Sequence, residues 1–246
     1  QSIGDTDAAA MTLSMLWAAV GNTGPAFFWT LFYVLRDPQV LRDVQDELST
    51  VLGPLPASSS PLVMTQAQLN ALTILDACVS EALRLASMSL TVRGAVGKGA
   101  SVTGADGTTY RLRRGDVAVI ASHAVHMDPD LYPEPHEFRY QRFIAGESTP
   151  ASEGLRCTTV QGSQLTGSEL FMAFGQGAHK CPGRRFARNE VKTCVAALLR
   201  ALDVELTAGD GCAPPPLDVK FAGLGVVPPK GDVRLRILGL RSAPVA

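Results

Sequence analysis

One stretch carries most of the information in this chain: Phe171-Met-Ala-Phe174-Gly175-Gln-Gly177-Ala-His179-Lys-Cys181-Pro-Gly183. Its three glycines let the backbone approach a flat ligand closely, because they carry no side chain that would block it. Cys181 lies at the start of the helical pattern that follows, where the helix dipole and free N–H groups favour a thiolate. A thiolate in such a loop is what a haem iron takes from a protein. For Cys181 alone a structural role is the alternative, but the complete spacing F-G-x-G-x-H-x-C-x-G favours the haem ligand.

The composition narrows the class of protein. The 246 residues suffice for one large domain or two modest ones, and 22 Lys and Arg face 23 Asp and Glu. This balance excludes nucleic-acid binding by bulk charge. Hydrophobic residues make up 46% of the chain and charged residues only 18%. This low charged fraction indicates large buried surfaces, contact with a partner half that is missing from the sequence, or contact with a membrane. Five cysteines without a C-x-x-C pair indicate a reducing compartment rather than a disulfide framework.

An uncharged run over residues 8–35 is long enough to span a bilayer. A transmembrane helix and a buried helix of a large domain are both consistent with its length. Its centre contains Asn22, Thr23 and Pro25, and no clusters of Lys and Arg flank it. These features favour the buried helix. Because Pro25 removes a backbone donor, we expect the helix to open near Gly21.

The order of the remaining elements predicts an α+β fold that is mainly helical, rather than a doubly wound sheet. Asp37-Pro38 is a helix start, and Thr65 is the N-cap of a short helix. Hydrophobic periodicity predicts further helices over residues 40–52, 74–87 and 183–202. Apolar runs between turn signals predict strands over residues 90–96, 101–103, 108–112, 117–121, 217–221 and 233–238.

The cysteine stretch resembles the haem-binding loop of the cytochrome P-450 family. Two further motifs occur earlier in the chain, in the order of that family. Glu81-Ala-Leu-Arg84 resembles its E-x-x-R helix, and Phe138-Arg-Tyr-Gln-Arg142-Phe143 resembles the segment that supplies a second arginine. The resemblance covers the whole chain. It implies that residues 1–246 are the C-terminal part of a single haem-thiolate monooxygenase domain, with the N-terminal half and the membrane anchor before Gln1.

The resemblance also implies a set of haem-site residues. Cys181 would be the axial ligand of the iron of haem b, with Phe174 beside it in the cofactor site. Arg93 and His179 would each bind a haem propionate, although a plain surface role for Arg93 stays open.

The resemblance assigns Glu81, Arg84 and Arg142 a structural role, positioning the cysteine loop. Apolar neighbours of Glu81 and Arg84 predict that this pair is buried and needs Arg142 and backbone groups as partners. His123 and His126 form an H-x-x-H pair without a suitably spaced third ligand, so we interpret them as structural rather than as a zinc site.

Gly21-Asn22-Thr23 resembles the oxygen-activating segment of the family, in which an acid usually precedes the threonine. Asn22 stands in place of that acid, and an amide does not relay protons by titrating. This departure resembles the branch that contains the sterol and oxysterol 7α-hydroxylases and prostacyclin synthase. Thr23 and Asn22 would then be the catalytic residues. Thr23 favours a hydroxylase, because hydroxylation needs proton delivery. A peroxide isomerase and an inactive truncated product are the alternatives.

Partners and location follow from the same resemblance. The substrate would be small, apolar and steroid-like, with Phe221 and Leu224 as candidate contacts. Electrons would come from NADPH through a reductase that docks on a basic face near Arg184, Arg185 and Arg188, unless these charges are merely solvated. The expected location is the cytoplasmic face of the endoplasmic reticulum membrane, through an anchor absent from this sequence.

Overall fold

The computed structural model describes residues 4–54, 63–104, 106–144, 157–158, 164–165, 167–208 and 212–241. Its α-helices are α1 (Asp5–Arg36), α2 (Pro38–Leu52), α3 (Gln66–Ala71), α4 (Thr73–Ala86), α5 (Ser122–His126), α7 (Gly167–Leu170) and α8 (Arg184–Ala201). The 3₁₀ turns of the described residues are η1 (Tyr140–Phe143), η2 (Gly177–His179) and η3 (Val219–Phe221). The α+β class, with helices predominating, is confirmed.

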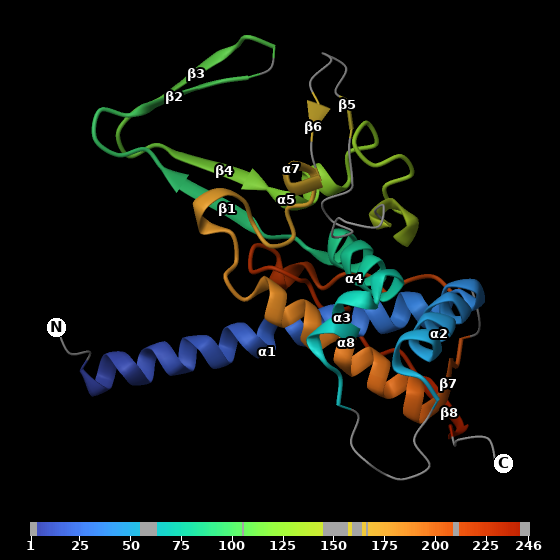
Figure 1. Cartoon of the computed structure of the whole chain (residues 1–246). Helices are drawn as coiled ribbons and strands as arrows, with labels where there is room; N and C mark the ends of the chain where they lie inside the picture. The colour runs from blue at the N-terminus through green and yellow to red at the C-terminus, as the bar shows by residue number, and fades with distance from the viewer. Residues whose placement is uncertain are drawn as a thin grey trace.

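The strands form antiparallel pairs rather than one continuous sheet. They are β1 (Leu90–Gly94) with β4 (Val117–Ala121), β2 (Ala100–Thr103) with β3 (Thr109–Leu112), β5 (Cys157–Thr158) with β6 (Gln164–Leu165), and β7 (Leu202–Leu206) with β8 (Leu235–Leu240). The first two pairs extend away from the helices in Figure 1. All four strands expected between residues 90 and 121 are present.

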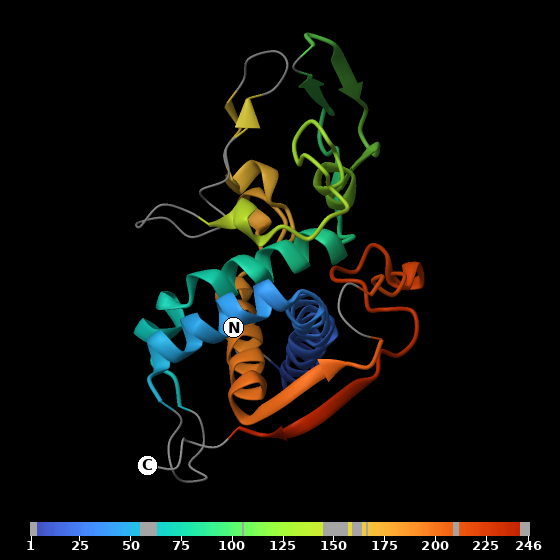
Figure 2. The same cartoon turned by 90° about the vertical axis from the view of Figure 1, so that its right-hand side faces the viewer.

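The core lies where α1, α2, α4 and α8 pack against one another. In Figure 2, α8 stands beside α1, and the β7–β8 ribbon runs along the bottom of both. Fully buried side chains from each of the four helices meet there, among them Trp29, Leu48, Leu75 and Val195. This packing holds the start of α8, and therefore the cysteine loop, against the middle of α1.

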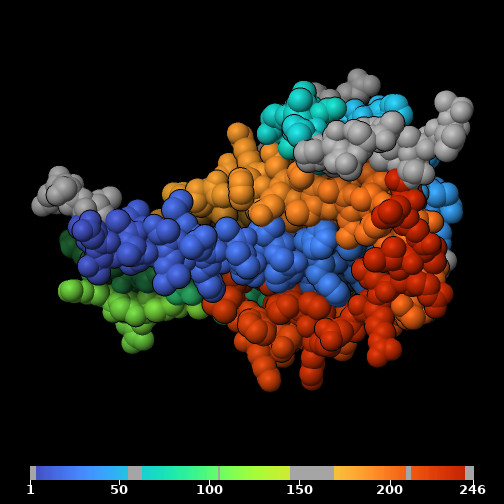
Figure 3. Space-filling view, turned by 90° about the horizontal axis from the view of Figure 1, so that it is seen from below, coloured from blue at the N-terminus to red at the C-terminus, as the bar shows by residue number. Residues whose placement is uncertain are grey.

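Helix α1 runs unbroken through Pro25, so the predicted opening near Gly21 is wrong. Proline removes a single donor, and the carbonyl that its ring approaches belongs to glycine, which adjusts most easily. The buried-helix prediction holds for residues 26–35, apart from the half-buried Phe27 and Phe28, whereas residues 5–20 are exposed. Residues 5–20 lie at the surface toward one end of the molecule in Figure 3. In the described part of the chain, no helix is sufficiently long and apolar to cross a membrane.

The helix starts predicted from capping residues are confirmed, whereas one strand predicted near the C-terminus is not. The Asp37 carboxylate caps α2, and Thr65 forms a capping box with Gln68 at α3. The predicted strand over 217–221 is wrong: its second half is the 3₁₀ turn η3, where the Asp218 side chain accepts the N–H of Lys220. Such a local bond competes with strand pairing.

The tail nevertheless pairs with the chain where α4 leads into β1. Val227 N–H donates to the carbonyl of Ala86 at 2.9 Å, and Met88 N–H donates to that of Gly225 at 2.8 Å. Gly223 N–H donates to the carbonyl of Met88 at 2.7 Å. These bonds fix the segment 217–229, called the C-terminal hairpin below, beside the start of β1.

Candidate functional site

The cysteine loop is closed by its own backbone. Cys181 N–H donates to the carbonyl of Phe174 at 2.8 Å, which joins the two ends of the loop. Gly175 and Gly177 have φ angles of 72° and 67°, a left-handed conformation that glycine adopts without steric cost. The glycine spacing therefore serves the path of the backbone.

Cys181 is a half-buried residue that lies just before α8. A Cβ atom at position 183 would lie 3.9 Å from this sulfur, so Gly183 leaves that side of it uncovered. Arg184 Nη1 donates to the Cys181 carbonyl at 3.1 Å and ties the loop to the first turn of α8. An accessible thiol in a glycine-lined loop fits a haem iron, which takes a Cys thiolate as axial ligand.

The Glu81–Arg84 pair is fully buried, as predicted. Arg84 Nε and Nη2 donate to the two carboxylate oxygens of Glu81 at 2.7 and 2.8 Å, a bidentate contact. Arg142 Nε donates to Glu81 Oε1 at 3.2 Å, and the backbone N–H of Arg139 donates to the same oxygen at 2.9 Å. The predicted triad is thus assembled around one carboxylate.

Backbone carbonyls satisfy the rest of the Arg84 guanidinium. Nη1 donates to the carbonyls of His126 and Pro135, both at 2.7 Å, and Nη2 donates to that of Glu137 at 3.2 Å. A buried charge pair is tolerated only when its remaining donors find partners. Arg84 therefore organises the irregular segment that follows α5.

The H-x-x-H histidines occupy different environments. His126 is fully buried, and its Nε2 accepts the N–H of Met172, just before the cysteine loop. His123 is half-buried, with Nδ1 3.3 Å from the Ser87 carbonyl. Within the described residues, no group of three His, Cys, Asp or Glu could hold a metal ion. The bond to Met172 is a structural contact of His126, in line with the interpretation.

Asn22 and Thr23 are both half-buried on α1. Asn22 Oδ1 accepts the N–H of Val226 at 2.9 Å, so the amide oxygen is engaged by the C-terminal hairpin. A Cβ atom at position 225 would lie 2.1 Å from Asn22 Oδ1, which explains why a glycine stands there. The contact was not predicted, because neither Gly225 nor Val226 belongs to a recognised motif.

The two proposed propionate donors lie at the surface and do not contact each other. Arg93 is exposed on β1, where its Nη1 donates to the neighbouring Val92 carbonyl at 2.9 Å. His179 is exposed on η2, within the cysteine loop. Both side chains are accessible to an anionic group, as the expectation requires.

The predicted basic face of α8 is wrong at Arg188. Its guanidinium forms a close ion pair with Asp76 on α4, and Nη2 donates to Ser80 Oγ at 2.8 Å. Lys192 lies 3.2 Å from the same carboxylate. Burial raises the pKa of Asp76, but the charges of Arg188 and Lys192 outweigh it and lower the pKa overall.

Further along α8, Arg200 is buried and donates to the backbone carbonyls of Leu48, Gly53 and Pro54. Arg185 is exposed and Arg184 half-buried. The basic surface at the cysteine end of α8 therefore contains these two arginines and the half-buried Lys180.

Phe221 and Leu224 project from the C-terminal hairpin, with 47% and 60% of their surface exposed. A cavity of about 180 Å³ lies elsewhere, lined by Trp29, Tyr33, His123, His136 and Leu217 among others. None of the predicted catalytic or cofactor residues lines it. Within the described residues, the candidate substrate contacts thus lie on an open face.

Comparison with known proteins agrees with this geometry. A model of the family "Cytochrome P450" matches residues 1–235. Pig "Cytochrome P450 7A1" is 33% identical over 96% of this chain and 46% of its own length. Rabbit "7-alpha-hydroxycholest-4-en-3-one 12-alpha-hydroxylase" is 37% identical over 90% of this chain and 43% of its length. The chain thus spans about half the length of these relatives.

Solved structures give the same fold. A crystal structure of a cytochrome P450 superposes with a TM-score of 0.73 at 22% identity, covering 99% of this chain and 47% of the other. A mutant P450 haem domain gives a TM-score of 0.72 at 21% identity, covering 98% and 46%.

Proposed function

The chain belongs to the cytochrome P450 family, and we propose that it is the cysteine-bearing part of a haem-thiolate monooxygenase domain. The observation that carries the proposal is the closed loop of Cys181, whose sulfur is left uncovered by Gly183 at the start of α8. The relatives are about twice as long, and we propose that the active unit is likewise a longer protein. Its N-terminal half would complete the site.

Haem b, when bound, supplies the reductive activation of O₂ that hydroxylation requires. Cys181 would hold its iron, and the partly buried ring of Phe174 would lie in the same site. Arg93 and His179 would bind the propionates, because both are accessible cationic or hydrogen-bonding groups. The Glu81–Arg84–Arg142 triad, whose Glu81 and Arg84 are buried, would help to position this loop and would take no part in the chemistry.

Thr23 is the residue we assign to proton handling, since its hydroxyl both donates and accepts a hydrogen bond. Asn22 would act differently from an acid at this position. Its amide oxygen already accepts the Val226 N–H, and only its NH₂ group is left for a water or a substrate. Asn22 therefore positions the C-terminal hairpin and does not titrate.

We propose a steroid-like lipid as the substrate. The names of curated relatives describe hydroxylation of sterols at the 7α position and at the 12α position. The reaction would replace a C–H bond by C–OH with one atom of O₂. The other oxygen atom leaves as water, which consumes two electrons and two protons. Phe221 and Leu224 would contact the substrate.

The electrons would come from NADPH through a reductase. Lys180, Arg184 and Arg185 form the basic surface beside the cysteine loop that would attract an acidic partner. Arg188 is excluded from this role by its pairing with Asp76. We further propose a location at the cytoplasmic face of the endoplasmic reticulum membrane, as the family resemblance implies.

The test is turnover by the full-length protein with a reductase, NADPH and a panel of sterols, with products identified by mass spectrometry. Hydroxylated sterol would support the proposal, and its position would distinguish 7α from 12α. Thr23→Ala should raise NADPH consumption per product several-fold. Turnover of a peroxide without a reductase, unaffected by Thr23→Ala, would replace the proposal by an isomerase. Product from the full-length protein but none from residues 1–246 alone would mean that this chain is an inactive truncated product.

A further inference from the structure

We propose that His126 and Tyr132 are positioning residues that clamp the peptide 170–172 and thereby fix the path of the Cys181 loop. The inference rests on the proposed haem-thiolate function, because it concerns how the thiolate is held in place. Neither side chain touches Cys181 itself, so both would act through the backbone that precedes the loop.

The clamp consists of two hydrogen bonds on either side of Phe171. Tyr132 Oη donates to the carbonyl of Leu170 at 2.9 Å, and Met172 N–H donates to His126 Nε2 at 2.9 Å. Tyr132 and His126 are both fully buried. Since water does not compete for buried groups, each bond is costly to lose.

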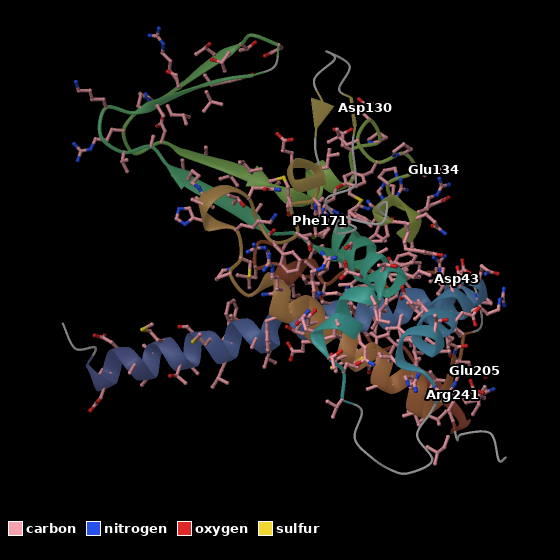
Figure 4. The ribbon with its side chains drawn as sticks, viewed as in Figure 1. Asp43, Asp130, Glu134, Phe171, Glu205 and Arg241 are labelled. Atoms are coloured by element: carbon pink, nitrogen blue, oxygen red, sulfur yellow. The ribbon has the colours of Figure 1, made fainter. Side chains whose placement is uncertain are left out.

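Aromatic contacts carry the constraint from the clamp toward the loop. The His126 ring stacks on Phe171, with centroids 5.9 Å apart and an interplanar angle of 21°. Phe171, labelled near the middle of the molecule in Figure 4, packs edge-on against Phe174 at 6.2 Å. Phe174 in turn accepts the N–H of Cys181 through its carbonyl. The path from His126 to Cys181 is therefore continuous.

The clamp also rests on the buried ion pair. Arg84 donates to the backbone carbonyl of His126 at 2.7 Å, and its guanidinium carbon lies 5.0 Å from the centre of the Tyr132 ring. A cation over an aromatic face is attracted by the ring quadrupole. Arg84 thus contacts both clamp residues, which gives the E-x-x-R helix a route to the cysteine loop.

The chemistry of the two side chains suits these roles. Burial, followed by the charges of Arg84 and His123, lowers the pKa of His126 to about 3, so the ring stays neutral and Nε2 accepts. Its Nδ1 is buried without a hydrogen-bond partner in the described structure. Burial raises the pKa of Tyr132, so its hydroxyl stays protonated and donates. Burying Nδ1 without a partner costs free energy, and an apolar side chain at this position would avoid that cost. The bond from Met172 to Nε2 is therefore a reason for a histidine at this position.

His123 provides a matched control, because it lies one helical turn before His126 and its ring contacts the Ser87 carbonyl rather than the peptide 170–172. The variants are His126→Leu, His126→Gln, Tyr132→Phe and His123→Leu, all made in the full-length protein without haem. The amide hydrogen exchange of residues 170–181 is measured, together with the alkylation rate of Cys181.

We expect His126→Leu to raise exchange at Met172 and Cys181 about tenfold, the factor for one lost buried hydrogen bond. Tyr132→Phe should act in the same direction, by a smaller factor. His126→Gln should restore much of the protection, since Gln Oε1 takes the place of Nε2 as acceptor. If His126→Leu and Tyr132→Phe exchange and alkylate no faster than His123→Leu, the clamp is refuted.

The same proteins, loaded with haem, separate this inference from the proposed function. The readout is the red-shifted Soret band of the reduced, carbon-monoxide-bound state and its rate of loss. If the wild type lacks the band while the exchange results hold, the haem-thiolate proposal fails and the clamp stands. If the wild type shows it and the clamp variants lose it no faster than His123→Leu, the function stands and the clamp fails.

Discussion

Asn22 on α1 and Val226 in the C-terminal hairpin are joined by a direct hydrogen bond, in which Asn22 Oδ1 accepts the Val226 N–H at 2.9 Å. Two turns further along α1, Trp29 Nε1 donates to the Val227 carbonyl at 2.7 Å. The helix therefore grips the hairpin at two consecutive residues. These two bonds fix the position of the hairpin, with its exposed apolar side chains, relative to α1 and therefore relative to Thr23.

Gly225→Ala should destabilise the protein more than Gly231→Ala. Both glycines have a left-handed φ, 129° and 101°, which costs a non-glycine residue roughly 1–3 kcal/mol. At Gly225 the new Cβ would also overlap Asn22 Oδ1, whereas at Gly231 it meets nothing within 4 Å. Urea unfolding measures both losses. Adding Asn22→Ala to Gly225→Ala should recover stability, and equal losses at the two glycines would contradict the account.

Glu81→Gln should cost several kcal/mol of unfolding free energy. The substitution leaves Arg84 and Arg142 without their buried counter-charge, and breaking such a pair costs about 3–5 kcal/mol. The control is Asp116→Asn, whose partner Arg113 is largely exposed, so that about 1 kcal/mol or less is expected. A loss for Glu81→Gln as small as the control's would mean that the pair is not buried.

Acid should destabilise the wild type through His126, and the His126→Gln variant should lack this effect. The pKa of His126 is about 3 in the folded protein and near 6.5 when unfolded. Between these values only the unfolded state binds the proton, so stability falls as the pH falls, at up to ~1.4 kcal/mol per unit. The measurement is urea unfolding from pH 7 to 4. Parallel curves for wild type and variant would rule out a buried neutral ring.

Substitutions at Arg185 and Arg188 should have different effects: Arg185 variants should change the rate of reductase docking, and Arg188 variants should change stability. Arg188→Ala removes a half-buried partner of Asp76 and should lower the unfolding free energy, whereas Arg185→Ala should change it by about 0.5 kcal/mol or less. Arg185→Glu should slow association with an acidic reductase, most at low salt. Stopped-flow mixing at two salt concentrations tests this. If Arg188→Ala associates with the reductase more slowly than Arg185→Glu does, Arg188 rather than Arg185 belongs to the docking surface.

The sequence pattern predicted those features that depend on neighbours along the chain. Apolar residues around Glu81 and Arg84 indicated burial, and the Asp37 and Thr65 caps indicated where helices begin; all are confirmed. Arg142, 61 positions from Glu81, was expected through the family resemblance, but the other partners far apart in sequence were not predicted. Arg188 meets Asp76 across 112 positions, His126 meets Met172 across 46, and Asn22 meets Val226 across 204. Periodicity reports which face of an element is apolar, not which distant residue will contact it.

The absorption spectrum of the reduced, carbon-monoxide-bound full-length protein tests the central claim, ligation of haem iron by Cys181, most directly. Wild type and Cys181→Ser are compared, with Cys194→Ser as control because that thiol is exposed on α8. We predict a strongly red-shifted Soret band for wild type and Cys194→Ser, and its loss in Cys181→Ser. A red-shifted band that persists in Cys181→Ser, or that is absent from the wild type, would contradict the account.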